Sequence, residues 1–326
     1  MKRRAVLHLL ASAAVVAPQS GWGQQSRVAR VGFLTPGPVL AQTDARVAAM
    51  MAGLAEHGYA PGRNLIIEQR AALGRTHDLP PLAHELAAAK VDVIVTTGFP
   101  PALAAKSTGL PTVAAAGVGD PVATGLIESL ARPGTNVTGI SDDAGELSTK
   151  RLGILKELVP HLRRVAMLWN QDDLGMSLRY KASSEAAAGL GVAVQALGVR
   201  EPDDFNIAFA AMDHDRPDAI LMVSDSLTVL NRKRVFDYAA AHSLPAIYES
   251  EMYVRDGGLM SYGADSAESY RRAAGFVDQI LRGAKTAELP FERPTRYVFA
   301  INLRTAIATS IQIPPLLLAR ADAVIE

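Results

Sequence analysis

The feature that most constrains the fold is a regular alternation, beginning at residue 28, of short β-branched runs with amphipathic helical stretches. Residues 91–95 are valines and an isoleucine around one aspartate, as in a buried strand, whereas residues 43–56 repeat apolar side chains at helical spacing. This alternation is typical of a parallel sheet covered by helices on both faces. The sequence therefore predicts an α/β fold.

The chain is long enough for two such units, since its 326 residues compare with roughly 100–200 for an ordinary domain. The alternation occurs twice, and the stretch 132–139 between the two sets, rich in Gly, Pro and Asn, is typical of a crossing between lobes. We predict two Rossmann-like lobes with parallel sheets joined by hinge crossings. The expected division is a signal peptide at 1–23, an N-terminal lobe at 28–120 and 258–285, a C-terminal lobe at 121–257 and 286–326, and hinge crossings near 121–145, 250–263 and 285–297.

The first 23 residues have the pattern of a signal peptide. Lys2, Arg3 and Arg4 precede an apolar run at 5–17 that contains no acidic residue and is shorter than the ~20 residues that span a bilayer. Small residues then precede an expected cut before Gln24. The arginine pair leaves the twin-arginine and the general secretory routes both open. The sequence predicts a protein exported to the periplasm.

The charge balance argues against nucleic-acid and membrane-surface partners. The expected leader carries three of the 33 basic residues and none of the 33 acidic ones, so its removal leaves a formal charge of −3. A mildly acidic chain lacks the positive field that binds nucleic acid or anionic lipid. Because no later segment reaches membrane-spanning length, we also expect no membrane insertion of the mature chain.

The sequence lacks cysteine and the motifs of several common catalytic and cofactor sites. The chain has no cysteine, which excludes thiol nucleophiles, disulfides and iron–sulfur clusters. It also lacks the G-x-S-x-G elbow, the P-loop and the dinucleotide fingerprint. We therefore expect no cofactor, no metal and no catalysis. The alternative is a periplasmic enzyme that uses Asp120 with Asp225 or Glu249 as an acidic pair.

Ligands of open parallel sheets bind beyond the carboxyl ends of the strands, so the strand-end loops of two facing lobes should border one cleft. The candidate ligand-binding residues all lie in these loops: Thr35, Thr97, Gly98, Phe99, Asp120, Trp169, Asn170, Ser224, Asp225, Glu249, Ser261 and Tyr262. The loops contain no lysine or arginine. Because a phosphate or a dicarboxylate ordinarily calls for an arginine fork, the sequence favours a neutral or zwitterionic small molecule.

Each residue type in this set has an expected contact with the ligand. Hydroxyls and helix-start N–H groups are expected to hold a ligand carboxylate, and Asp120, Asp225 or Glu249 an ammonium group. The aromatic residues of the set are expected to form apolar walls or a cation–π face. Structural roles are the alternative, because Asp120 is well placed to cap a helix predicted over 121–131, and the aromatic residues can pack between the lobes.

Short motifs spread over the whole mature chain point to one family. They lie at 31–34, 53–64, 91–95, 119–122, 132–139, 150–152, 257–263, 289–295, 301–303 and 313–325. Together they resemble the ABC transporter substrate-binding family, whose members are often predicted to import amino acids and share the type I periplasmic-binding fold.

The resemblance implies a receptor without catalytic activity that closes two lobes on a solute. It further implies delivery of the solute to an ABC permease and its ATPase in the membrane. Some members are similar to receptors for tryptophan or other aromatic amino acids. The chain departs from the common family pattern at Asn170–Gln171, where Asn-Pro is usual, and this departure leaves the ligand open.

A ligand-sensing regulator is the main alternative from another class, because bacterial repressors reuse the same bilobal fold beneath a DNA-binding head. Such a head needs roughly 50–60 residues before the first strand. Here the first strand is predicted at residue 30, directly after the expected leader. The sequence therefore favours the transport receptor.

Overall fold

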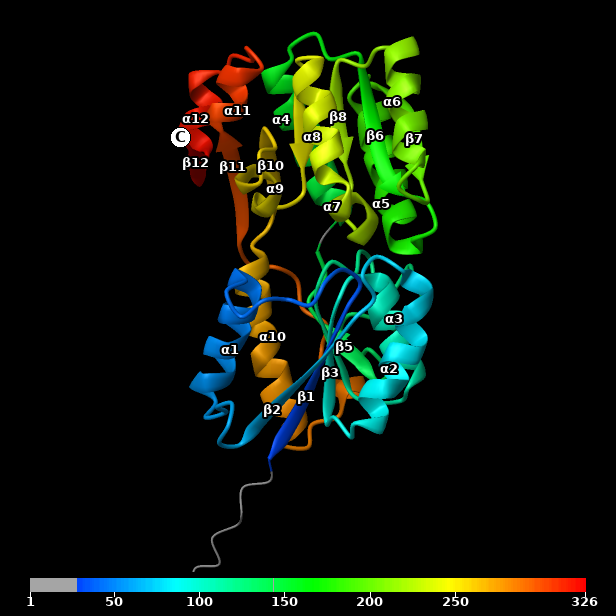
Figure 1. Cartoon of the computed structure of the whole chain (residues 1–326), viewed down its shortest axis with the longest axis vertical. Coiled ribbons are helices and arrows are strands. Elements are labelled where there is room, and N and C mark those ends of the chain that lie inside the picture. Colours follow the sequence, from blue (N-terminus) through cyan, green and yellow to red (C-terminus); the bar gives the residue numbers. More distant parts are fainter. Residues whose placement is uncertain (1–27, 143) are drawn as a thin grey trace, which may run out of the picture.

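The computed structural model describes residues 28–142 and 144–326, which form two lobes stacked along the long axis of the molecule (Figure 1). The expected leader at 1–23 lies outside these residues. Each lobe is built on one sheet, so the predicted α/β fold with two parallel-rich sheets is confirmed. Within the described residues, no helix combines the length and the apolar character that crossing a membrane requires.

The first lobe contains a five-stranded parallel sheet with the order β2-β1-β3-β4-β5. Its strands are β1 (Ala29–Thr35), β2 (Leu65–Ala71), β3 (Val93–Thr97), β4 (Thr112–Ala116) and β5 (Val137–Gly139). Its helices are α1 (Ala45–Glu56), α2 (Leu79–Ala88), α3 (Phe99–Ser107) and α10 (Ser266–Leu281), with short 3-10 turns η1 (Thr76–Asp78) and η2 (Thr286–Glu288). Helix α10 returns to this lobe from far along the chain (Figure 1).

Helices α1 and α10 lie side by side on one face of the first sheet. Met50 and Leu54 of α1 and Val277 of α10 are fully buried in one apolar cluster with the inner strands. A Cβ added at Gly53 would lie 2.7 Å from the Cβ of Ala274, so a missing side chain permits this close helix contact. Helices α2 and α3 contribute to a separate cluster on the other face.

The second lobe contains a seven-stranded sheet with the order β12-β11-β10-β9-β8-β6-β7, in which only the β10–β11 pair is antiparallel. Its strands are β6 (Arg164–Asn170), β7 (Ala193–Val199), β8 (Ala219–Met222), β9 (Ala246–Tyr248), β10 (Met260–Ala264), β11 (Tyr297–Asn302) and β12 (Ala323–Ile325). Its helices are α4 (Ala144–Leu158), α5 (Leu174–Gly189), α6 (Asp204–His214), α7 (Ser226–Leu230), α8 (Arg232–Ala241), α9 (Glu251–Arg255), α11 (Leu303–Ala308) and α12 (Pro315–Arg320).

Three chain segments join the lobes. The first crossing runs from β5 to α4, the second from β10 to α10, and the third from η2 to β11. The first and third crossings pair with each other, because Ile140 and Glu292 form a parallel bridge and the Ser141 N–H donates to the Glu292 carbonyl at 2.8 Å. This pairing makes the two crossings a single strap between the lobes.

The first crossing occupies only the end of its predicted range, and the second lies just after its predicted range. β5 pairs with β4, so residues 121–139 stay with the first sheet and the first crossing begins only after Gly139. β10 pairs with β9 and β11, so its residues belong to the second sheet and not to the N-terminal lobe, where the range 258–285 places them. Sheet membership depends on pairing between distant segments, which local sequence patterns do not contain.

The helix predicted over 121–131 is wrong, because these residues form turns. Asp120 Oδ1 accepts the N–H groups of Val122 and Ala123 at 2.9 and 3.0 Å, as an N-cap would. Gly125 then has a φ of +71°, a left-handed conformation that ends the turn before a helix forms. Asp120 therefore caps a turn on an exposed loop.

Candidate functional site

The carboxyl ends of the parallel strands of both lobes face each other where the lobes meet (Figure 1). A Cβ added at Gly175, at the N-terminus of α5, would lie 3.1 Å from the Cβ of Phe99 and 3.5 Å from the Val118 carbonyl oxygen of the first lobe. A Cβ added at Gly74 would lie 2.7 Å from Cδ1 of Leu230. The lobes are therefore in contact, and the strand-end loops line this interface.

The first-lobe candidates lie at the ends of β1 and β3. Thr35 is buried and its hydroxyl donates to a carbonyl of the following loop at 3.2 Å. The Thr97 and Tyr270 hydroxyls form a hydrogen bond that ties β3 to α10. Gly98, with a φ of +89°, turns the chain into α3, and Phe99 begins that helix beneath Gly175. These four candidates are thus brought together.

Asn170 and Asp225 meet at the interface edge of the second lobe. Nδ2 of Asn170 donates to Oδ2 of Asp225 at 2.5 Å. Asp225 also forms a capping box at α7, because its Oδ1 accepts the Thr228 N–H at 2.8 Å while its own N–H donates to the Thr228 hydroxyl at 2.9 Å. Burial raises the pKa of Asp225, so the carboxylate carries its charge at some cost.

Trp169 lies in the apolar core of the second lobe instead of at the cleft surface. Its indole ring stacks on Tyr180 of α5 with a centroid separation of 3.7 Å and an interplanar angle of 5°. Neighbouring residues of a strand point to opposite faces, so Asn170 reaches the Asp225 side when Trp169 faces α5. Trp169 therefore makes a packing contact with α5 in this structure.

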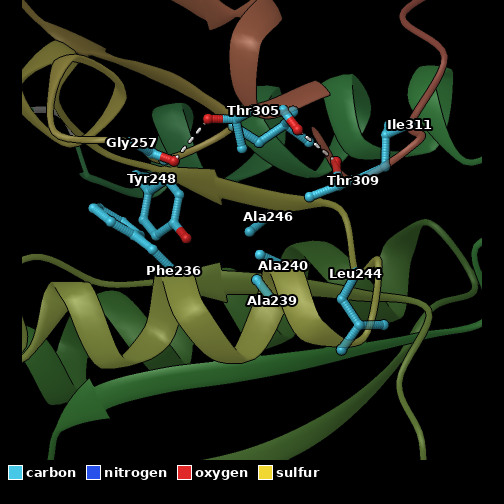
Figure 2. Close-up of a pocket in the computed structure, with 12 residues that line it drawn as sticks. Phe236, Ala239, Ala240, Leu244, Ala246, Tyr248, Gly257, Thr305, Thr309 and Ile311 are labelled. Atoms are coloured by element: carbon cyan, nitrogen blue, oxygen red, sulfur yellow. Dashed lines mark hydrogen bonds between the residues drawn. The ribbon is translucent and has the colours of Figure 1, made fainter. Parts of the chain in front are cut away.

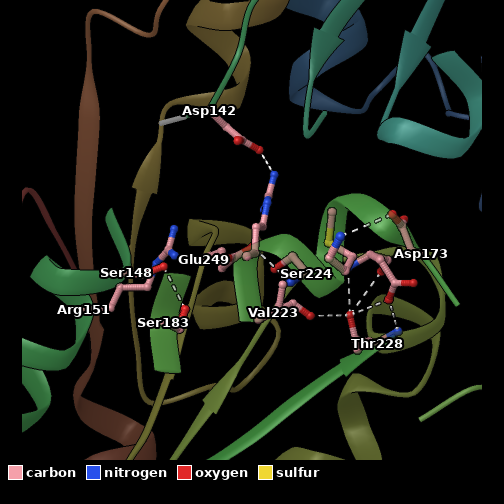
Figure 3. A network of polar contacts seen from close by, with 12 residues as sticks. Asp142, Ser148, Arg151, Asp173, Ser183, Val223, Ser224, Thr228 and Glu249 are labelled. Carbon is pink, nitrogen blue, oxygen red and sulfur yellow. Dashed lines mark hydrogen bonds and ion pairs between the residues drawn. The ribbon is translucent and has the colours of Figure 1, made fainter. Parts of the chain in front are cut away.

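Glu249, expected to hold an ammonium group, is paired with two arginines of the protein (Figure 3). Its Oε1 lies 2.8 Å from Nη1 of Arg151 in α4, and its Oε2 lies 2.6 Å from Nη1 of Arg179 in α5. All three side chains are at most 6% exposed. Burial opposes ionisation of Glu249, but Arg151 and then Arg179 outweigh burial and hold its pKa below the ordinary value.

Sequence reasoning missed these arginines because they come from helices and not from the strand-end loops. Arg46 of α1 is a third: its Nε and Nη2 donate to the two carboxylate oxygens of Asp44 at 2.9 and 2.7 Å. Its charge acts on the hydroxyls of Tyr270 in its own lobe and of Tyr253 in the second lobe. No local sequence pattern marks Arg151 and Arg179, because their shared partner Glu249 is distant in the sequence.

Three hydroxyls, one just after β8, one in α9 and one within β10, are buried without a hydrogen-bond partner in the described part of the chain. They belong to Ser224, Tyr253 and Ser261. Buried polar groups are rarely left unpaired, so these hydroxyls are positions from which a bound molecule can gain hydrogen bonds. Tyr262 follows Ser261, and its carbonyl accepts the Nε–H of Arg151 at 2.7 Å.

A small pocket lies apart from this interface, between α8, β9 and α11 (Figure 2). Its volume is about 10 Å³, enough for one water molecule. Its threonine hydroxyls already have partners, because Thr305 donates to the Gly257 carbonyl at 2.9 Å and Thr309 donates to the Thr305 carbonyl at 2.7 Å. The pocket is a packing gap and offers no recognition chemistry for an organic ligand.

Comparison with known proteins gives one matching family model. Residues 40–325 match the family described as ABC transporter substrate binding protein. Among curated proteins, the chain is similar to the tyrosine-binding protein of Clostridioides difficile strain R20291. The two are 25% identical over 261 residues, which cover 79% of this chain and 74% of the relative.

Two solved structures illustrate the likeness in fold. The ABC domain from Streptococcus pneumonia in complex with L-Trp superposes with a TM-score of 0.84 at 24% identity, over 91% of this chain and 99% of that one. The ligand-free, open structure of a substrate binding protein with adhesive properties from Clostridium difficile superposes with a TM-score of 0.67 at 22% identity, over 92% and 99%. The two lobes of this chain thus superpose better on the ligand-bound structure than on the open one.

Proposed function

The chain belongs to the ABC transporter substrate-binding protein family, and on that premise we propose that it binds an aromatic amino acid between its two lobes. As a member it is the substrate-binding component of an ABC transporter, a binding protein and not an enzyme, which serves a membrane permease. The predicted leader at 1–23 supports the further proposal that it works in the periplasm. The curated relative named tyrosine-binding protein supports the choice of an aromatic ligand.

The charge pattern of the interface is the observation that carries the choice of an amino acid. The arginines described there each have a carboxylate partner: Arg46 pairs with Asp44, and both Arg151 and Arg179 pair with Glu249. No arginine of this group is left to hold a phosphate or a second carboxylate. A ligand with balanced charges therefore suits this interface better than an anion.

We propose specific partners for the two charged groups of such a ligand. Asp225, which has an amide and a hydroxyl but no arginine among its hydrogen-bond partners, is suited to the ammonium group. The unpartnered hydroxyls of Ser224 and Tyr253 are suited to the carboxylate, together with the Phe99 N–H at the start of α3. Phe99 lies in the first lobe and Ser224, Asp225 and Tyr253 lie in the second, so a ligand held by both lobes favours the lobe contact.

Thermal melting against a ligand panel tests the proposal. The exported form is first unfolded and refolded to remove any bound solute, then mixed with tyrosine, tryptophan and phenylalanine, with polar amino acids, and with sugars, purines and polyamines. A ligand at 100 times its Kd adds about 2.7 kcal/mol to the free energy of unfolding, which raises the melting temperature by several degrees. We expect this rise only with aromatic amino acids, and a shift of Trp169 emission with the same compounds.

The other outcomes of the panel contradict the proposal in different ways. A rise in melting temperature with a sugar or a purine contradicts the proposed ligand class but is consistent with a binding protein. Chemical conversion of any compound, followed by mass spectrometry, contradicts a binding protein. Trp169 is the right reporter because it stacks on Tyr180 in α5, whose N-terminus contacts the first lobe.

Replacing Gly175 by leucine is expected to weaken ligand binding at least tenfold. A Cβ at this position already lies 3.1 Å from the Cβ of Phe99, so a larger side chain pushes the lobes apart and removes the closed arrangement from the population. Isothermal titration calorimetry with L-tyrosine measures the change. Gly189→Leu, at the exposed end of the same helix, is the matched control because a Cβ there meets nothing within 4 Å. Equal affinity in the two variants contradicts a ligand site that needs the lobe contact.

A further inference from the structure

Arg179 forms buried ion pairs with Glu249 of the second lobe and with Asp142 of the first crossing, two residues that Figure 3 labels. Nη1 of Arg179 pairs with Glu249 inside the second lobe, whereas Nη2 pairs with Asp142, which lies in the first crossing. The Arg179 and Asp142 side chains are 6% and 13% exposed. One guanidinium thus joins a fixed part of the second lobe to a segment that links the lobes.

The same face of α5 also touches the first lobe. Gly175 lies four residues before Arg179 and Ser183 four residues after it, so all three share one helical face. Gly175 contacts the first lobe, and a Cβ added at Gly119 of that lobe would lie 3.9 Å from Nε of Arg179. The Ser183 hydroxyl donates to the Ser148 hydroxyl of α4 at 2.8 Å. This face therefore runs from the lobe contact, past the crossing, to α4.

Strand β10, which leads into the second crossing, is held at the same centre. Nη1 of Arg151 pairs with Glu249, and its Nε donates to the Tyr262 carbonyl at the end of β10. A Cβ added at Gly263 would lie 1.8 Å from the Glu249 carbonyl oxygen, so only glycine permits this approach. Glu249 is thereby fixed against β10, and its ion pair with Arg179 orients that side chain toward the first crossing.

The two ion pairs of Arg179 respond differently to lobe movement. The pair with Glu249 lies within one lobe, so opening the cleft leaves it intact. The pair with Asp142 joins two segments whose relative position changes when the first crossing rotates. An interaction present in only one of two arrangements shifts the population toward that arrangement.

We propose that Arg179 is a positioning residue for lobe closure: by pairing with Asp142 in the first crossing, it raises the ratio of closed to open molecules without touching the ligand. The consequence for ligand affinity rests on the proposed function, whereas the consequence for the closure ratio does not. For a bound ligand, Arg179 lengthens the lifetime of the complex, whereas the strand-end loops determine which ligand is recognised.

The closure ratio of the ligand-free chain tests the proposal directly. Because the chain has no cysteine, spin labels at Ala52→Cys in α1 and Ile207→Cys in α6 report one inter-lobe distance by pulsed electron resonance. Sucrose is added in steps, since excluded osmolytes favour the arrangement with less exposed surface. We expect Asp142→Ala to lower the closed-to-open ratio roughly tenfold at each sucrose concentration, the order expected when one hydrogen-bonded charge pair is lost.

Two further variants separate an ion pair from a general structural effect. Asp142→Asn keeps an acceptor oxygen without the charge, so its closure ratio should fall between those of the parent and Asp142→Ala. Asp172→Ala is the control, because Asp172 pairs with Arg200 on the exposed surface and should leave the ratio unchanged. The melting temperature of all three variants should stay near that of the parent, because both lobe cores are untouched.

Stopped-flow measurement with L-tyrosine then relates closure to binding. We expect Asp142→Ala to speed dissociation about as much as it lowers the closure ratio, with little change in the association rate. An unchanged distance distribution in Asp142→Ala, or a parent that stays open at every sucrose concentration, overturns the proposal. Failure of L-tyrosine to bind the parent contradicts the proposed function alone, because the distance measurement uses no ligand.

Discussion

Replacing Glu249 by glutamine should lower the free energy of unfolding by about 3–5 kcal/mol at neutral pH, the cost of breaking a buried ion pair from one side. The variant keeps the size of the side chain, so the loss reports charge and not a cavity. Arg151 and Arg179, at 3% and 6% exposure, are then buried without the charge that both share. Urea unfolding of the ligand-free chain measures the difference.

Glu251→Gln is the matched control, two residues further along the chain at the start of α9. Glu251 pairs with Arg255 one turn later in α9, where the arginine side chain is 65% exposed. Pairs of this kind contribute up to about 0.5 kcal/mol. Equal losses in the two variants would contradict a central role for Glu249 in the second lobe.

The pH dependence of the Glu249 effect has a defined sign. The pKa of Glu249 is lowered in the folded chain, so its stabilising contribution is fully present above the unfolded value of 4.5. The contribution is lost as the pH falls through the lower, folded pKa. The gap between parent and Glu249→Gln should therefore stay constant from pH 8 to about pH 5 and close only in stronger acid.

The sequence predicts the individual elements well because strands and helices follow from local periodicity. Strand β3 and helix α1 begin and end within two residues of the expected positions, and β1 begins one residue before its expected start. The assignment of β5 and β10 to lobes fails because both are short strands next to a crossing. Only their partners, β4 on one side and β9 with β11 on the other, decide which sheet they join.

Some residues of the candidate site could likewise be predicted from the sequence, and others could not. Strand ends in parallel sheets converge by topology, and this alone brings Thr97, Gly98 and Phe99 to the interface with the second lobe. Trp169 and Asn170 show the limit, because strand alternation fixes that they face opposite ways but not which one faces the cleft. Arg151 and Arg179 were out of reach, since a buried arginine in a helix is recognisable only once its carboxylate partner is placed.

Asp173 shows how the lobe contact acts on ionisation. It caps α5, where its Oδ1 accepts the N–H groups of Gly175 and Met176 at 2.8 and 3.3 Å. Its side chain is buried directly behind the residue that contacts the first lobe. Burial and then the charge of Asp225 raise the pKa of Asp173 from 3.8 to about 7.

An acid whose pKa is raised by folding destabilises the fold when it ionises. The penalty begins above the unfolded pKa of 3.8 and is complete above about pH 7. Asparagine keeps the side-chain oxygen that caps the helix and removes the charge. Asp173→Asn is therefore expected to raise the free energy of unfolding at pH 8 by up to about 4 kcal/mol, with little gain near pH 4.

Urea unfolding of parent and variant at pH 4, 6 and 8 measures this widening gap. Asp172→Asn is the control, because the neighbouring carboxylate is 65% exposed. A gap for Asp173→Asn that does not grow with pH means that the carboxyl group stays hydrated, and hence that the lobes are apart at Gly175 in solution. The measurement thus tests both the ionisation of Asp173 and the lobe contact that buries it.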